Sequence, residues 1–119
     1  MIETGIDIIE ISRFEKILSD NVFIEKYFTQ SEIVYSQNSS NSAQHFAVRF
    51  AAKEAVRKIL LNYIKPLSWK GSWIENRKNG SPILCLSQKV LSICEIKSYS
   101  ISLTHTNDIA AAVVIMEME

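Results

Sequence analysis

SAQHFAVRFAAKEAVRKILL, residues 42–61, is the longest helical pattern in the sequence, and the rest of the chain can be arranged around it. Plotted at about 100° per residue, apolar side chains cover one side of this helix and much of the other. The first side carries Ala43, Phe46, Ala47, Phe50, Ala51 and Leu61, and the second carries Val48, Ala52, Ala55, Val56 and Ile59. A helix that is apolar nearly all round is buried, so the pattern predicts a long buried helix at the centre of the fold.

Charged side chains on this helix need an explanation. Glu54 lies within the first apolar side, where a carboxylate is unfavourable by roughly several kcal/mol unless it is paired, hydrogen-bonded or bound to a metal. A structural pair with Lys58, four residues later, is the ordinary explanation, and a functional site is the other. Arg49, Lys53 and Arg57, also spaced by four, suit a solvated basic face or, alternatively, phosphate binding.

The composition is that of an ordinary globular domain. The chain has 119 residues, 47% hydrophobic and 22% charged, which suits one domain over residues 1–119. Its 13 basic and 13 acidic side chains cancel, which argues against a nucleic-acid partner. Cys85 and Cys94 are too few for a zinc site or a disulfide framework. We expect neither a signal peptide nor a membrane span, and therefore a cytoplasmic protein with no membrane partner.

Local patterns predict one strand and several short helices before the long helix. Residues 2–9 are rich in β-branched side chains and predict a strand. Helices are expected over residues 13–18 and 21–28. Capping-box spacings, in which a hydroxyl and a glutamate three residues later satisfy backbone amides, predict helix starts at Ser12 and Thr29.

The second half of the chain predicts two hairpins. Asn79-Gly80 separates β-rich runs at residues 73–77 and 83–86, which indicates a type I′ turn with positive φ at both central positions. A two-turn helix is expected over residues 87–94. Residues 98–104 and 109–118, joined by a polar turn, predict the second hairpin. The expected fold class is α+β, with an antiparallel sheet packed on the long buried helix.

Three chemically active residues could meet at one site. They are Asp7 at the end of the first strand, Glu54 in the long helix and His105 at the tip of the last hairpin. Each residue also has a structural explanation. An acid at a strand end, such as Asp7, often caps a turn, and a histidine at a hairpin tip, such as His105, is often only solvated. Two carboxylates would suit Mg²⁺, which takes one or two protein oxygens and completes its shell with water and phosphates. Zn²⁺ is disfavoured without a Cys/His cluster.

Four motifs occur in order along the chain. They are GIDIIEI at Gly5 to Ile11, RFAAKEAVRK at Arg49 to Lys58, NGSP at Asn79 to Pro82 and SISLTHTNDIAAA at Ser100 to Ala112. Together they resemble the phosphopantetheinyl transferases, and in particular the short holo-acyl-carrier-protein synthase type. The likeness runs almost from end to end.

The resemblance implies a fatty-acid biosynthesis enzyme. Such enzymes transfer the 4′-phosphopantetheine group of coenzyme A to a serine of apo acyl carrier protein and release adenosine 3′,5′-bisphosphate. The matching positions imply that Asp7 and Glu54 are catalytic Mg²⁺ ligands. Lys58 would contact the phosphates and protonate the leaving oxygen. The acceptor of the serine proton stays open between Glu54, Asp7 and a metal-bound water.

The resemblance also implies an assembly and further contacts. Proteins of this type and length are homotrimers, with the coenzyme A cleft between neighbouring subunits. Arg49, Phe50 and His105 match positions that contact the adenosine bisphosphate end from the neighbouring subunit. Arg13 matches a position that faces the acidic carrier protein.

One departure from the family pattern keeps alternatives open. The long helix of the family commonly ends in a Gly-Thr-Gly-like turn, whereas Leu60, Leu61, Asn62 and Tyr63 stand here, which predicts an altered path for the pantetheine arm. A transferase for a polyketide or peptide-synthetase carrier is one alternative. A coenzyme A-binding trimer without turnover is another, although the metal-ligand carboxylates argue against it.

Overall fold

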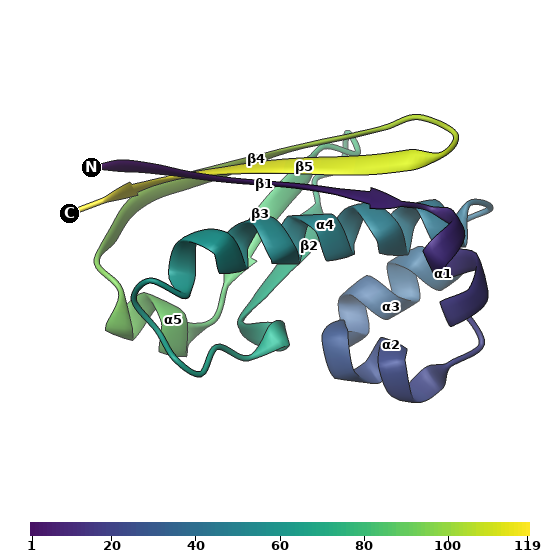
Figure 1. Cartoon of the computed structure of the whole chain (residues 1–119), viewed down its shortest axis with the longest axis horizontal. Helices are drawn as coiled ribbons and strands as arrows, with labels where there is room; N and C mark the ends of the chain where they lie inside the picture. Colours follow the sequence, from purple (N-terminus) through teal and green to yellow (C-terminus); the bar gives the residue numbers. More distant parts are fainter.

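The long helix lies under a three-stranded antiparallel sheet (Figure 1). In the computed structural model, which describes residues 1–119, this helix is α4 and spans Ser42–Leu60. The strands are β1 (Ile2–Glu10), β2 (Ser72–Asn76), β3 (Pro82–Leu86), β4 (Ile96–His105) and β5 (Ile109–Met118). The other helices are α1 (Ser12–Ile17), α2 (Asn21–Tyr27), α3 (Gln30–Gln37), η1 (Trp69–Gly71) and α5 (Gln88–Ile93). No helix, α4 included, is both long enough and apolar enough to cross a membrane.

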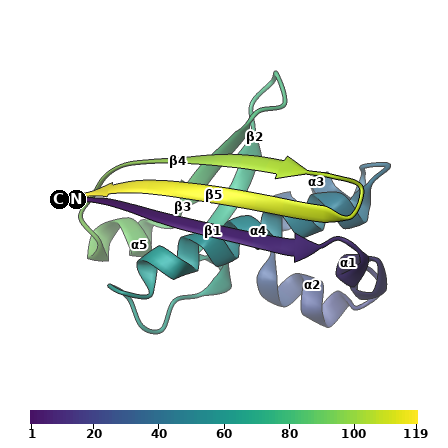
Figure 2. The ribbon, with the colours of Figure 1, turned by 45° about the horizontal axis from the view of Figure 1, so that its top comes forward.

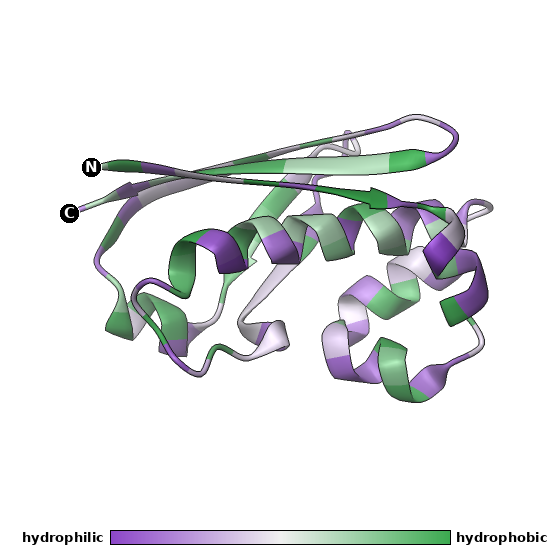
Figure 3. Ribbon diagram, viewed as in Figure 1, coloured by the Kyte–Doolittle hydropathy of each residue, from purple (hydrophilic) through white to green (hydrophobic).

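The central strand β5 packs directly on α4. It lies between β1 and β4, and it is largely hydrophobic in Figure 3. Alternate side chains of β5 point toward α4 and are buried, namely Ala110, Ala112, Val114, Met116 and Met118. On β1, a Cβ added at Gly5 would collide with the backbone carbonyl oxygen of Ala55 on α4. The glycine therefore allows β1 to lie against α4, two residues before Asp7.

The hairpin predicted around Gly80 is present, but the predicted turn type is wrong. β2 and β3 pair antiparallel, and their loop projects past the β4 side of the sheet (Figure 2). Gly80 has a φ of 89°, whereas Asn79 does not have a positive φ. The amide of Gly80 donates to the carbonyl of Arg77 at 2.8 Å. The chain therefore turns over residues 77–80 with one left-handed residue, instead of the two that a type I′ turn needs.

The two predicted capping boxes have different outcomes. At Thr29 the box is present, because its hydroxyl accepts from the amide of Glu32 while the Glu32 carboxylate accepts from the Thr29 amide at 3.0 Å. At Ser12 the prediction is wrong. Ile11 occupies the N-cap position in a helical conformation (φ −64°, ψ −32°), and no side chain caps α1. Ser12 therefore lies inside the first turn, where it cannot act as the cap.

Helices α1 and α2 pack on α4 through an aromatic cluster. Its rings belong to Phe14, Phe23, Tyr27, Phe28, Phe50 and Trp69. Phe50 is stacked on Trp69 with their ring centroids 5.3 Å apart. This cluster fixes the direction in which Phe50 leaves α4.

Candidate active site

Asp7 and Glu54 lie together between β1 and α4. Asp7 follows Gly5 on the α4-facing side of β1, and its side chain is 19% exposed. Partial burial raises the pKa of Glu54, and the nearby Asp7 carboxylate raises it further. Nearby positive charges lower the pKa of Glu54 but do not cancel this rise; they belong to Arg57, Lys58 and Arg13. We call this pair of acids the carboxylate site.

Lys58 pairs with Asp7 instead of Glu54. Its Nζ lies 3.3 Å from Oδ1 of Asp7 and donates to the backbone carbonyl of Ile6 at 2.5 Å. The structural Glu54–Lys58 pair considered as the ordinary explanation is therefore wrong, because the lysine reaches across to β1. Glu54 is left without a cation partner within ion-pair distance.

The carboxylate site fits a divalent cation of the magnesium type. Two carboxylates that lie close enough to raise the pKa of Glu54 would both be stabilised by a shared positive charge. No three His, Cys, Asp or Glu side chains gather in the chain as a metal-ligand group. That donor set is too small for a structural zinc site, but it matches Mg²⁺, which uses few protein oxygens and retains water and phosphate ligands.

The basic residues of α4 are largely structural. Lys53 is 1% exposed, and its Nζ lies 2.9 Å from Oε1 of the fully buried Glu32. Arg57 donates to the carbonyl of Leu67 at 2.7 Å and lies over the ring of Trp69, 4.0 Å from its centroid. The interpretation as a solvated face is therefore wrong for Lys53, because α3 and the chain before β2 pack over it.

Arg49 faces a separate cavity of about 200 Å³, which we call the Arg49 cavity. Its Nη1 donates to the carbonyl of His45 at 3.2 Å, and its Nη2 donates to Oδ1 of Asn76 at 2.7 Å. Its Nε is buried without a hydrogen-bond partner, and Arg49 forms no ion pair although it is only 2% exposed. A guanidinium with donors to spare in a cavity wall suits an anionic ligand.

His105 belongs to the Arg49 cavity and not to the carboxylate site. It lines the cavity and lies 2.9 Å, Nε2 to Nε2, from Gln44. Arg49 and Glu54 are five residues apart, which places them about 140° apart around α4 and about 7.5 Å apart along it. The predicted meeting of three residues therefore holds for Asp7 and Glu54 but not for His105 within one chain.

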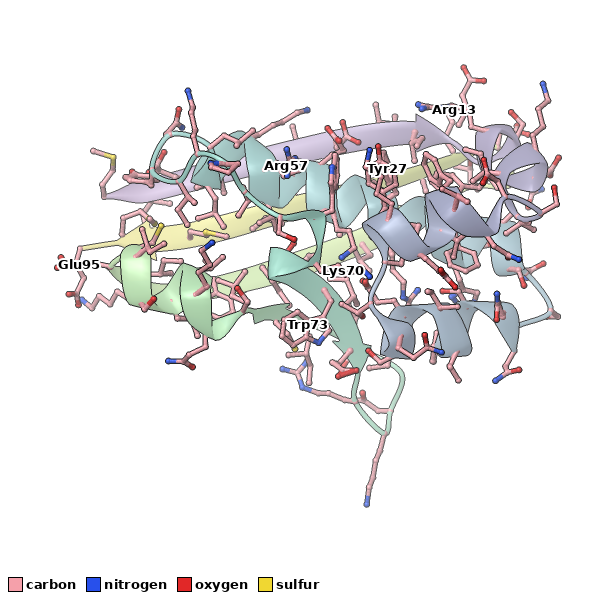
Figure 4. The ribbon with its side chains drawn as sticks, turned by 90° about the horizontal axis from the view of Figure 1, so that it is seen from below. Arg13, Tyr27, Arg57, Lys70, Trp73 and Glu95 are labelled. Atoms are coloured by element: carbon pink, nitrogen blue, oxygen red, sulfur yellow. The ribbon has the colours of Figure 1, made fainter.

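Phe50 and Arg13 lie outside the Arg49 cavity. Phe50 is held in the aromatic cluster and is not among the residues that line the cavity. Arg13 is exposed on α1 and close enough to Glu54 to lower its pKa. Figure 4, which views the molecule from below, shows Arg13 beside α1 and Arg57 farther along α4.

The segment after α4 lies against β1, near Lys58. The hydroxyl of Tyr63 donates to the carboxylate of Glu3, and Nδ2 of Asn62 donates to the carbonyl of Lys58 at 3.5 Å. Side chains therefore bridge the end of α4 and the start of β1, and the altered path of the pantetheine arm stays a prediction.

Sequence reasoning missed several residues of the Arg49 cavity, namely Tyr35, Gln44, His45 and Asn76. His45 could have been found, because it precedes Arg49 by four residues on the same helix. Tyr35 and Asn76 come from α3 and β2, and no spacing in the sequence shows that they reach this cavity.

Known proteins resemble this chain over nearly its whole length. Residues 3–114 match the model of the 4′-phosphopantetheinyl transferase superfamily. A holo-[acyl-carrier-protein] synthase of Treponema denticola is 41% identical over 117 residues, covering 95% of each chain. The Helicobacter pylori holo-[acyl-carrier-protein] synthase in complex with coenzyme A superposes with a TM-score of 0.85 at 33% identity, over 97% of this chain and 100% of that one. A Bacillus anthracis homologue in complex with CoA (3′,5′-ADP) gives 0.79 at 33% identity, over 98% and 96%.

Proposed function

This chain belongs to the 4′-phosphopantetheinyl transferase superfamily, and from that premise we propose that it is a holo-acyl-carrier-protein synthase. It transfers 4′-phosphopantetheine from coenzyme A to a serine of apo acyl carrier protein and releases adenosine 3′,5′-bisphosphate, in the cytoplasm and for fatty acid biosynthesis. The observation that carries the proposal is the pairing of Asp7 with Glu54 beside Lys58.

The charges of the carboxylate site suit phosphoryl transfer. Asp7 and Glu54 would hold Mg²⁺, which when bound neutralises the pyrophosphate of coenzyme A. The serine hydroxyl of the carrier attacks the β-phosphate, a reaction that depends more on positioning and charge neutralisation than on covalent help. Lys58 holds its ammonium at the edge of this site, where it contacts the phosphates and gives a proton to the leaving oxygen.

The Arg49 cavity takes the other anionic group of coenzyme A. The pyrophosphate is assigned to the carboxylate site, which leaves the 3′-phosphate for a second cationic site. Arg49 and His105 would bind this group. Phe50, inside the aromatic cluster, would contact the adenosine end only at the edge of the cleft.

A coenzyme A molecule then bridges two chains. Arg49 and Glu54 project about 140° apart from α4, so one chain presents its two sites in different directions. The outer face of the sheet offers an interface, because no helix covers it (Figure 1) and it carries exposed apolar side chains. They are Ile2, Ile6, Ile8, Ile109 and Ile115, between 37% and 66% exposed. We assign this face to a homotrimer with a site at each subunit boundary.

The carrier protein docks beside the carboxylate site. Arg13 is exposed on α1 and within electrostatic reach of Glu54, so a carrier held by Arg13 would present its serine close to the reacting phosphate. The family resemblance implies that the carrier protein is acidic, and an acidic partner suits a cationic docking residue such as Arg13.

Intact-mass spectrometry tests the proposed function. Apo acyl carrier protein is incubated with this protein, coenzyme A and Mg²⁺, and a parallel reaction contains EDTA. A gain of one phosphopantetheine that EDTA prevents is the expected result. No gain on fatty-acid, polyketide or peptide-synthetase carriers, while coenzyme A still binds, would leave a coenzyme A-binding trimer as the better description.

A further inference from the structure

A second histidine lies in the wall of the Arg49 cavity. His45 is half-buried on α4, one turn before Arg49, and it lines the cavity together with His105. Its ring packs edge-on against Tyr35 with centroids 5.4 Å apart. The side chain is therefore held in place on one side by an aromatic ring and on the other by the guanidinium.

The contact with Arg49 fixes the tautomer of His45. Nη1 of Arg49 lies 3.3 Å from Nδ1 of His45, and a guanidinium can only donate. Nδ1 must therefore be the acceptor, and the ring proton lies on Nε2. No protein group accepts a hydrogen bond from Nε2.

The surroundings of His45 keep it neutral. Burial lowers the pKa of His45 most strongly, and the positive charge of Arg49 and the neighbouring His105 lower it further. A neutral imidazole beside Arg49 supplies a hydrogen-bond donor without adding a second adjacent positive charge.

The anion that would complete this arrangement does not come from the protein. Arg49 forms no ion pair with a carboxylate, and the nearest acidic influence, Glu32, is already paired with Lys53. Nη2 of Arg49 gives one of its two N–H groups to Asn76, so its second N–H and the free Nε2–H of His45 are two unused donors at one cavity. A phosphate monoester offers three acceptor oxygens to such donors.

We propose that His45 binds the 3′-phosphate of coenzyme A by donating its Nε2–H, next to Arg49. This inference rests on the proposed function, because it needs coenzyme A as the ligand. It gives His45 a binding role in addition to its packing on Tyr35.

Two variants of His45 separate the effect of its hydrogen-bond donor from the effect of its packing on Tyr35. His45→Phe keeps a ring against Tyr35 but has no donor, whereas His45→Gln places an amide N–H near the position of Nε2. Isothermal titration calorimetry, in buffer that contains Mg²⁺, measures the affinity of each folded variant for coenzyme A and for dephospho-coenzyme A, which lacks the 3′-phosphate. We expect His45→Phe to bind coenzyme A about tenfold more weakly with dephospho-coenzyme A unchanged, and His45→Gln to recover most of the loss.

The possible results distinguish this inference from the proposed function. If His45→Phe weakens both ligands equally, or neither, the assignment of His45 to the 3′-phosphate is overturned while coenzyme A binding stands. If the wild-type protein binds no coenzyme A, the proposed function fails and this inference fails with it.

Discussion

At the scale of single residues, Glu54 shows a conflict between stability and function. Its carboxylate is partly buried and lies beside Asp7, and both effects raise its pKa. A carboxyl group whose pKa is raised on folding binds its proton more tightly in the folded state. The free energy of unfolding therefore falls as the pH rises through the folded pKa, unless a cation neutralises the pair.

Glu54→Gln should remove this conflict together with the activity. We expect transfer to fall by at least about a hundredfold, because the site loses a charge that holds the cation. In EDTA the variant should melt at a higher temperature than the wild type at pH 8, and the difference should shrink at pH 5. Thermal denaturation at both pH values checks the second result, and full activity across a Mg²⁺ titration would refute the first.

Lys58 should compete with the cation for Asp7. Its ammonium lies 3.3 Å from Oδ1 of Asp7 but is 52% exposed, so the pair is worth little. We expect Lys58→Met to bind Mn²⁺ about two- to fivefold more tightly in the absence of coenzyme A, while transfer is lost. Electron paramagnetic resonance titration measures the free Mn²⁺.

A matched control for the Lys58 experiment exists elsewhere on the surface. Lys97 forms a comparable exposed pair with Glu117 at 3.7 Å, away from the carboxylate site. Lys97→Met should leave Mn²⁺ affinity unchanged. Weaker Mn²⁺ binding by Lys58→Met than by the control would mean that Lys58 supports the cation and does not compete with it.

At the scale of elements, the sequence predicts where most helices and strands lie but not what covers them. Periodicity locates α4 and both hairpins because each pattern depends on neighbours in the chain. The capping box at Ser12 fails because Ile11 already has a helical conformation, which moves the helix start to a position before Ser12. The partner of Lys53 is missed for a related reason, since Glu32 comes from a different helix.

The buried Lys53–Glu32 pair should hold α3 and α4 together. Both side chains are at most 1% exposed, and Glu32 also accepts from the amide of Ile74 at 3.0 Å. Lys53→Met leaves a buried carboxylate unpaired, so we expect the free energy of unfolding to fall by about 3–5 kcal/mol. Urea denaturation measures it, with Lys97→Met as a control that should change by less than about 1 kcal/mol. A loss for Lys53→Met no larger than the control would remove the pair from the structural account.

At the scale of the whole molecule, the uncovered face of the sheet should decide the assembly. Ile6 and Ile8 on β1 are 66% and 65% exposed, and Ile115 on β5, which pairs with Thr4, is a diagonal neighbour of Ile6. Ile8→Lys should dissociate the trimer, because burying a lysine among isoleucines is unfavourable, and activity should fall with it. Light scattering coupled to gel filtration measures the mass.

The control for this face is another exposed apolar residue. Val22 is 81% exposed on α2, away from the sheet, so Val22→Lys should leave both the mass and the activity unchanged. A wild-type mass equal to one chain would contradict the proposed assembly outright.

In the candidate site, too, the sequence does not show which residues from different elements come together. Asp7 and Glu54 were predicted together, and a single chain brings them together. The residue pattern also predicts His105 beside these acids, which is wrong within one chain, because His105 lies with Arg49 in a separate cavity. The assignment of Arg49 and His105 to a neighbouring subunit, which the family resemblance implies, stays a prediction. Helical spacing alone places Arg49 and Glu54 on different faces of α4, but it cannot show that His105, on β4, lies with Arg49 and not with the acids.

The most direct test combines two inactive variants in one assembly. Asp7→Asn disables the carboxylate site and Arg49→Gln disables the Arg49 cavity, so each alone should fail to modify apo acyl carrier protein. The two are co-expressed with different tags, and only assemblies that carry both tags are retained, with doubly tagged wild type as the control. In a mixed cyclic trimer one boundary in three joins an intact site to an intact cavity, so intact-mass measurement should show about a third of the wild-type rate. Mixed assemblies as inactive as their parents would contradict a catalytic site built from two chains.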